Sequence, residues 1–276
     1  MKEIVAADIP QIKKLLQDVL RVSEYTQLER MGGLTNHTYR VTLEDGQIYV
    51  VRLPGEGTEE LINRNDEKVS TQLACQLGID ADLLYFGVSG EKVTRYIDGA
   101  STLAAASFLD FDILRKSAEV LCVLHTSGAD TKVPFDVFQM ASDYEKIIHD
   151  NSVDLFDGYE EVKAQIMQIR AAATTDESVS VPCHNDPLCE NWVLDQNGKL
   201  YLIDWEYAGM NDGMWDLADV SIEASFTPEQ DQAFLQFYFG RAATQEEIFR
   251  FHANKLYLDF LWADRKSTRL NSSHTS

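Results

Sequence analysis

The chain has 276 residues, of which 45% are hydrophobic and 25% are charged, a composition typical of a globular protein with a substantial core. Acidic residues outnumber basic ones by 45 to 24, and the formal net charge of -21 argues against a nucleic-acid partner, whose phosphates would be repelled. No apolar run reaches the roughly 18 to 20 residues of a membrane span, and the N-terminus lacks a signal-peptide core, so we expect a cytoplasmic protein.

Four cysteines are spread along the chain, and none forms a C-x-x-C pair. We therefore expect reduced thiols in the core or in loops. A zinc cluster of Cys183, His184 and Cys189 is an alternative, but it lacks a fourth ligand at a familiar spacing.

The first predicted element is an amphipathic helix, because apolar residues recur at helical spacing over residues 9–20. Apolar, β-branched runs on either side of Asp45-Gly46 then predict a hairpin with a two-residue turn. In that register Arg52 lies opposite Tyr39.

A glycine pair, Gly32-Gly33, stands at the entrance of this hairpin. Glycines let backbone N–H groups approach an anion closely, and Arg52 could reach the phosphates of a nucleotide bound there. A Gly-Gly pair alone is weak evidence, since most such pairs only form turns.

The next segment has the apolar spacing of a helix over residues 59–77, with Glu67 inside it and Gly78 as a stop signal. Strands predicted over 82–88 and 92–97 would complete an antiparallel sheet. Beyond residue 98 the pattern becomes helical, over 108–125, 135–148 and 159–173.

A polar stretch from His184 to Asn191 carries the strongest chemical signal, because it is followed by a second hairpin that ends at Asp204. The Asn197-Gly198 dipeptide predicts a two-residue turn, and that register places Asn191 directly opposite Asp204. An amide oxygen and a carboxylate oxygen at one hairpin end would suit Mg²⁺. An ordinary hairpin with scattered acids is the alternative.

The C-terminal part is predicted helical over residues 216–226, 228–239 and 245–264. Residues 266–276 then lose aromatic and acidic residues together, which suggests a disordered or non-native tail.

The pattern H-x-D-x-x-x-x-N followed by I-D-W-E resembles the active site of the aminoglycoside phosphotransferase and choline kinase superfamily. The resemblance implies an α+β, two-lobed, protein-kinase-like fold, with an antiparallel-sheet nucleotide-binding lobe over 1–97 and a mostly helical catalytic and substrate-binding lobe over 98–265. It also implies ATP and Mg²⁺ as cofactors.

By this resemblance Asp186 is the catalytic aspartate on the acceptor hydroxyl, while Asn191 and Asp204 bind the metal. Glu67 would pair with Arg52 and fix its cation on the phosphates, and His184 would be a scaffold residue. The residues implied in nucleotide binding are Gly32, Gly33, Asn36, Arg52, Glu67, Tyr96 and Ile97.

Several motifs, among them G-G-L-T-N and I-D-W-E-Y-A-G, are similar to those of the bacterial choline kinase branch. The acceptor would then be a small cation, choline, held by Glu206, Glu223 and Trp262. A quaternary ammonium is bound by aromatic faces and carboxylates, and Trp205, Tyr207 and Trp215 are further aromatic candidates. A second tryptophan usual in the family is replaced here by Arg265.

Two alternatives remain open from the sequence. The chain could phosphorylate another small alcohol, such as ethanolamine or an aminoglycoside, or it could be an inactive nucleotide-binding pseudokinase. The presence of the five residues of the implied catalytic set favours an enzyme: these are Arg52, Glu67, Asp186, Asn191 and Asp204. The oligomeric state is not predicted.

Overall fold

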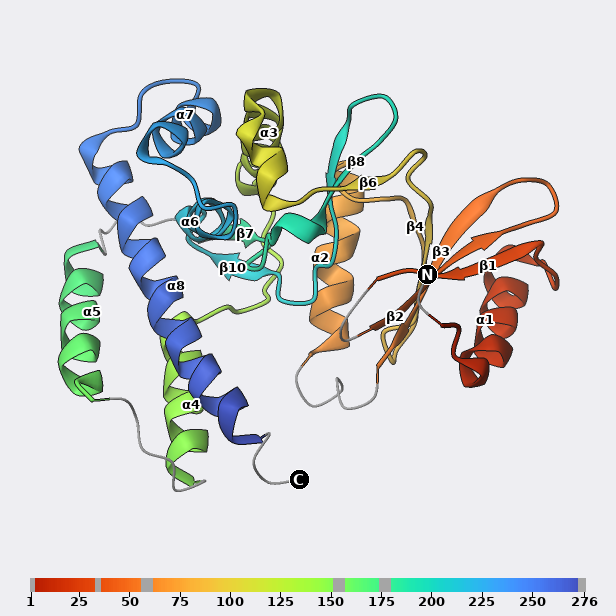
Figure 1. Cartoon of the computed structure of the whole chain (residues 1–276), viewed down its shortest axis with the longest axis horizontal. Helices are drawn as coiled ribbons and strands as arrows, with labels where there is room; N and C mark the ends of the chain where they lie inside the picture. The colour runs from red at the N-terminus through yellow and green to blue at the C-terminus, as the bar shows by residue number, and fades with distance from the viewer. Residues whose placement is uncertain (1–2, 33–35, 56–61, 151–156, 174–179, 273–276) are drawn as a thin grey trace. The chain divides into compact units, whose positions relative to one another are not determined.

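The computed structural model describes residues 3–32, 36–55, 62–150, 157–173 and 180–272 (Figure 1). The chain forms two compact units, one of Met1–Leu103 with Glu190–Ala208 and the other of Ala104–Cys189 with Gly209–Ser276. The hairpin that ends at Asp204 thus packs with the N-terminal unit, although it follows residue 97 in the chain. The functional division into lobes at residue 97 stays a prediction.

The N-terminal unit contains a five-stranded antiparallel sheet in the order β1-β2-β3-β5-β4. A smaller sheet of order β6-β8-β9 accompanies it. The strands are β1 (Gln27–Arg30), β2 (Asn36–Thr42), β3 (Ile48–Pro54), β4 (Leu83–Phe86), β5 (Lys92–Arg95), β6 (Ser101–Thr102), β8 (Trp192–Leu194) and β9 (Leu200–Leu202).

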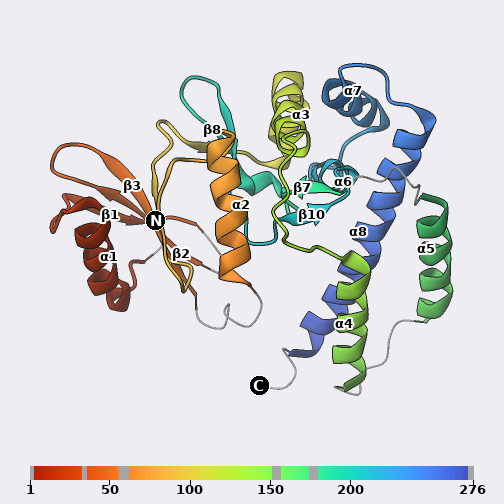
Figure 2. The ribbon, with the colours of Figure 1, turned by 180° about the vertical axis from the view of Figure 1, so that it is seen from behind.

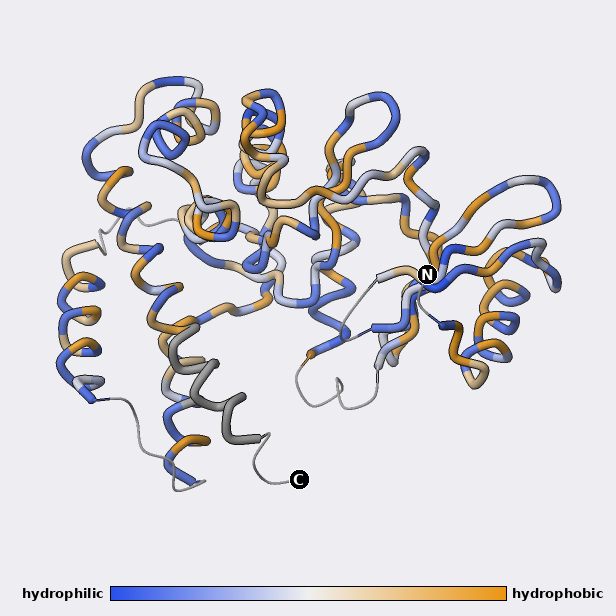
Figure 3. The backbone as a smooth tube through the Cα atoms, viewed as in Figure 1, coloured by the Kyte–Doolittle hydropathy of each residue, from blue (hydrophilic) through white to orange (hydrophobic). Residues whose placement is uncertain are grey.

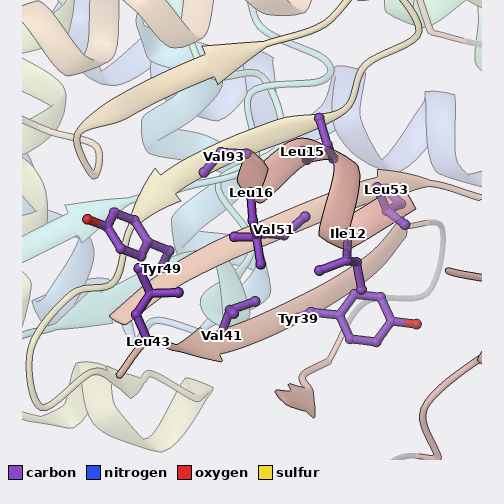
Figure 4. Close-up of a cluster of buried hydrophobic side chains, with 10 residues drawn as sticks. All are labelled: Ile12, Leu15, Leu16, Tyr39, Val41, Leu43, Tyr49, Val51, Leu53 and Val93. Carbon is purple, nitrogen blue, oxygen red and sulfur yellow. The ribbon is translucent and has the colours of Figure 1, made fainter. Parts of the chain in front are cut away.

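One face of the larger sheet is covered by the predicted N-terminal helix, which consists of α1 (Ile9–Leu15) and a π-helical turn, η2 (Leu16–Leu20). Alternate residues of β3 point to this face, as the pleat of a strand requires. Figure 4 shows these β3 side chains packed with residues of the helix, and the cluster comprises Ile12, Leu15, Leu16, Tyr39, Val41, Leu43, Tyr49, Val51, Leu53 and Val93.

The other face of β3 presents Arg52, because it lies between Val51 and Leu53 and therefore points the opposite way. Helix α2 (Arg64–Gln76) supplies its partner, Glu67. The helix starts later than the sequence predicted, because Asn63 caps it. The side-chain oxygen of Asn63 accepts the backbone N–H groups of Asn65 and Asp66. The predicted start over residues 59–61 lies outside the described residues.

Both predicted hairpins form, but the predicted register of each is wrong by one residue. In the first, Thr38 rather than Tyr39 lies opposite Arg52. In the second, Trp192 pairs with Leu202. The reason is that each loop has three residues instead of two, with the glycine in the left-handed region at its end. The two glycines are Gly46 (φ 82°) and Gly198 (φ 80°).

The second unit is mostly helical. Its longest helix, α8, lies alongside α4 and α5 in both views (Figures 1 and 2). A two-stranded sheet of β7 and β10 lies in the same unit. The helices are α3 (Phe111–His125), α4 (Val137–Asp150), α5 (Tyr159–Ala173), α6 (Met214–Glu223), α7 (Pro228–Phe239) and α8 (Gln245–Ser272), and the strands are β7 (Val181–Cys183) and β10 (Gly209–Asn211).

Helix α8 continues to Ser272, past the boundary at residue 265 that composition suggested. No Gly or Pro follows residue 245, so nothing in the sequence forces an earlier helix end. Residues 273–276 lie outside the described part of the chain, and whether the tail is native stays open.

Hydropathy follows the expected amphipathic pattern, with apolar and polar stretches alternating along the helices and polar residues at the hairpin tips (Figure 3). Within the described residues, no helix has the length and apolar character needed to cross a bilayer.

Candidate active site

The N-terminal unit contains a buried ion cluster in which the carboxylate of Glu67 pairs with two arginines. Glu67 Oε1 lies 2.5 Å from Arg52 Nη1, and Glu67 Oε2 lies 2.7 Å from Arg64 Nη1. The Glu67 side chain is fully buried. The predicted Arg52–Glu67 pair is therefore present, and Arg64 is a partner that the sequence analysis missed.

Burial would raise the pKa of Glu67, but the charge of Arg52 and its hydrogen bond outweigh burial and hold this pKa below its ordinary value. Burial likewise opposes the charged form of Arg52, yet the charge of Glu67 raises the pKa of its guanidinium. Both groups are thus ionised at neutral pH. Besides this pairing with Glu67, Arg52 Nη2 donates to the Gly90 carbonyl at 2.8 Å.

Asp204 lies at the edge of this cluster. Its Oδ1 is 3.7 Å from Arg52 Nη1, and its side chain remains 38% exposed. The backbone at Asp204 is left-handed, with φ 71°, a conformation that Asp and Asn adopt more readily than other non-glycine residues. An exposed carboxylate beside a buried cation can accept a metal ion while the cation faces phosphates.

Asn191 lies at the same end of the β8–β9 hairpin as Asp204, but not directly opposite it. The Ile203 N–H donates to the Asn191 carbonyl at 2.9 Å, which continues the pairing of Trp192 with Leu202. The predicted opposition of Asn191 and Asp204 is wrong, because the three-residue loop shifts the register by one. The shared hairpin end remains, and it carries an amide and a carboxylate.

Glu206, predicted to contact the acceptor, lies in the N-terminal unit beside two other polar groups. Its Oε2 accepts the Asn36 Nδ2 hydrogen bond at 3.1 Å and lies 3.8 Å from Arg64 Nη1. Burial, with the negative charge of Asp204, raises the pKa of Glu206. Its role toward the acceptor stays a prediction.

The remaining predicted nucleotide residues also belong to this unit. Gly32 is exposed, whereas Gly33 lies outside the described residues. The Tyr96 N–H donates to the Ile48 carbonyl at 3.1 Å, and the Ile97 carbonyl accepts the Ala100 N–H at 3.0 Å.

The second unit holds Asp186 in a turn that is anchored from α6. The carboxylate of Asp216 accepts the backbone N–H groups of His184 and Asn185, each at 2.7 Å. Trp215 Nε1 donates to the Asn185 carbonyl at 3.1 Å, and Asn185 is left-handed, with φ 66°. Asp186 itself is half-buried, so its neighbours are fixed while its carboxylate can meet a substrate.

The anchoring role of Asp216 was missed in the sequence, because about thirty residues separate it from the turn. The one local signal is an acidic residue between Trp215 and Leu217 in an apolar run, since a buried carboxylate has to find donors. Asp216 Oδ2 also lies 3.0 Å from His125 Nε2, and His125 Nδ1 lies 2.9 Å from the Tyr238 hydroxyl.

A metal-type grouping exists here, but it is not the one considered from the sequence. In the described part of the chain, the ligand atoms of His125, Cys183 and Asp216 lie within 4.8 Å of one another. Burial, with the charge of Asp216, raises the pKa of the Cys183 thiol well above its ordinary value.

Two further predicted residues lie in the helices of this unit. Glu223 is half-buried at the end of α6, and Trp262 lies in α8, with its side chain outside the described part. Two other aromatic candidates are core residues, because Trp205 is 1% exposed and Trp215 is 2% exposed. A substrate cannot reach either of them.

Known proteins resemble this chain over nearly its whole length. The family model described as Choline/ethanolamine kinase matches residues 28–266. The structure of a choline/ethanolamine kinase family protein from Mesorhizobium loti gives a TM-score of 0.84 at 34% identity and covers 96% of this chain and 87% of that chain. The choline kinase LicA of Streptococcus pneumoniae gives a TM-score of 0.79 at 31% identity, with 97% and 92% covered.

A curated relative, protein LicA of Haemophilus influenzae, is 28% identical over 253 residues, which are 86% of this chain and 72% of the relative. The fold is thus the two-lobed α+β fold of protein-kinase-like phosphotransferases, as the sequence predicted. The chain belongs to the choline/ethanolamine kinase family. It is a phosphotransferase with an alcohol group as acceptor.

Proposed function

We propose that the protein transfers the γ-phosphoryl group of ATP to the hydroxyl of choline and releases phosphocholine. The observation that carries this proposal is the likeness to a choline kinase, LicA of S. pneumoniae, over nearly the whole of both chains. The family description covers ethanolamine as well, so the choice of choline is the part that needs testing.

ATP binding would use the N-terminal unit. Arg52, held by Glu67, would contact the phosphates, while Gly32 and Gly33 would offer backbone N–H groups to them. Because the Tyr96 N–H and the Ile97 carbonyl are already bonded, adenine would contact the Tyr96 carbonyl and the Ile97 N–H.

Mg²⁺ would be held by Asn191 and Asp204, and the donor set fits this ion. Carboxylate and amide oxygens are ligands that Mg²⁺ accepts, and the Asp204 carboxylate is 38% exposed, so it is open to a hydrated ion. When bound, the ion neutralises charge that develops on the phosphate oxygens.

Asp186 would orient the choline hydroxyl for in-line attack on the γ-phosphorus and accept its proton. The new bond joins the choline oxygen to phosphorus, the bond from phosphorus to the ADP oxygen breaks, and ADP leaves. Since the Asp216 carboxylate fixes the turn that carries Asp186, positioning would provide much of the rate enhancement.

The choline ammonium would be held by Glu223 and Trp262. A quaternary ammonium has no N–H to donate, so it is recognised by charge and by aromatic faces. Ethanolamine, in contrast, can donate N–H groups. A site built from carboxylates would therefore bind ethanolamine more favourably than an aromatic cage would.

The test compares kcat/KM for choline, ethanolamine and an aminoglycoside with the same enzyme and Mg-ATP. The proposal predicts that choline has the largest kcat/KM. A larger value for ethanolamine or for the aminoglycoside would contradict choline as the acceptor, although the phosphotransferase assignment would stand.

A further inference from the structure

Arg64 is the first residue of α2, and its guanidinium is buried among acids of the N-terminal unit. Its side chain is 7% exposed. A buried arginine is costly unless it is paired, and here Arg64 shares the carboxylate of Glu67 with Arg52.

The way in which Glu67 is shared restricts the orientation of Arg52. A carboxylate that faces one arginine tends to form two parallel hydrogen bonds with it. Arg64 occupies Glu67 Oε2, so Arg52 meets Oε1 alone and turns its Nη2 to the Gly90 carbonyl, at 2.8 Å. Without Arg64, the Glu67 carboxylate could rotate and take both oxygens to Arg52.

A second contact joins Arg64 to the segment that follows the metal-binding Asp204. Arg64 Nη1 is 3.8 Å from Glu206 Oε2, and Glu206 accepts the Asn36 amide. Arg64 therefore links three elements of the unit: the start of α2, the start of β2 and the end of the β9 hairpin.

The turn between β4 and β5 closes tightly on Arg64. A Cβ added at Gly90 would lie 2.6 Å from both Cδ and Nε of Arg64, and Gly90 has φ 96°. Since the same residue accepts the Arg52 hydrogen bond, one turn fixes the positions of both guanidinium groups.

We infer that Arg64 is a positioning residue for phosphoryl transfer, which holds one oxygen of Glu67 so that Arg52 stays aimed at the nucleotide phosphates. The inference rests on the proposed use of Arg52 in ATP binding. It assigns no contact between Arg64 and the substrate.

The test is a double-mutant cycle of Arg64→Gln and Glu67→Gln, with KM for Mg-ATP, KM for choline and the Mg-ATP Kd by calorimetry. Arg64→Gln is expected to raise the KM and Kd for Mg-ATP about tenfold and to leave the choline KM within about twofold. In the Glu67→Gln background, Arg64→Gln should raise the KM and Kd for Mg-ATP by less than about twofold further, because the ionic contact through which Arg64 acts on Arg52 is already lost. Arg64→Lys should recover most of the affinity, since an ammonium can still pair with Glu67.

A second test moves Arg64 without changing its charge. Gly90→Ala places a methyl group against the Arg64 side chain. Gly46→Ala introduces the same type of backbone strain at a position where the added methyl group would meet no heavy atom of the described residues within 4 Å beyond its two chain neighbours. Both should lower thermal stability, but only Gly90→Ala should raise the KM for Mg-ATP. This comparison remains informative if Arg64→Gln fails to fold.

An unchanged Mg-ATP KM and Kd in folded Arg64→Gln, or fully additive effects of the two glutamine variants, would overturn the inference and leave the proposed function intact. Absence of phosphate transfer by the wild-type protein would instead contradict the proposed function. The calorimetric Kd would still decide the role of Arg64 in that case.

Discussion

The guanidinium of Arg52, on strand β3, lies 3.7 Å from the carboxylate of Asp204, which follows strand β9 of the smaller sheet. A cation and an anion thereby stand side by side, the first buried and the second partly exposed. This arrangement suits a phosphate chain that meets Arg52 directly and Asp204 through a metal ion.

Asp204→Asn should raise the Mg²⁺ concentration needed for half-maximal turnover by about tenfold or more, because an amide lacks the charge that draws the ion. The measurement is turnover against Mg²⁺ at saturating ATP. Asp195→Asn, directly before the loop of the same hairpin, is the control and should leave the Mg²⁺ dependence unchanged. An unaltered dependence in Asp204→Asn would rule out metal binding there.

Asp216→Asn should destabilise the protein by about 1–3 kcal/mol, because the amide cannot accept both backbone N–H groups of the turn. It should also lower kcat through displacement of Asp186. Asp219→Asn is the matched control in the same helix: Asp219 is also buried, but neither of its carboxylate oxygens has a hydrogen-bond partner among the described residues. Burial, with the charge of Asp186, raises the pKa of Asp219 well above its ordinary value, so the neutral amide should cost little.

Urea unfolding measures both variants. Equal losses of stability in Asp216→Asn and Asp219→Asn would show that burial of a carboxyl, and not the anchoring of the turn, determines the effect.

Asp80 should make stability depend on pH. Burial raises its pKa from 3.8 to about 6, so the folded protein keeps this proton over a range in which the unfolded chain has lost it. Stability is therefore expected to fall as pH rises from about 4 to about 6, by about 3 kcal/mol from this group alone. Asp80→Asn should remove that part of the slope in urea unfolding series, and an identical slope in the variant would contradict the assignment.

Glu223→Gln should raise the KM for choline about tenfold with little change in the Mg-ATP KM, because it removes one charge from the proposed cation site. Glu229→Gln, at an exposed position early in α7, is the control. Equal effects on both substrates would instead indicate a general disturbance of the fold.

The sequence predicted α5 and α7 with their observed bounds, because strong helical periodicity and start signals such as Pro228 act locally. It also predicted the Arg52–Glu67 pair, through resemblance. The hairpin registers were harder to predict from the sequence, because a dipeptide such as Asn197-Gly198 fits both a two-residue turn and a three-residue loop that ends in glycine.

One residue could have resolved the second register. Asp195 favours the first position of a type I turn, and its carboxylate accepts the N–H groups of Asn197 and Lys199, each at 2.8 Å. The roles of Arg64 and Asp216 could not be predicted in this way, because their partners come from distant segments and depend on packing.

Phosphoryl transfer to choline with Asp186 as the catalytic aspartate is tested most directly by the transfer of label from γ-³²P-ATP. Wild-type protein with Mg²⁺ and choline should yield labelled phosphocholine. Folded Asp186→Asn should still bind Mg-ATP, and its rate of product formation should be lower by a factor of about 10³ or more. Absence of labelled phosphocholine with the wild-type protein, or an equal rate with Asp186→Asn, would contradict the account.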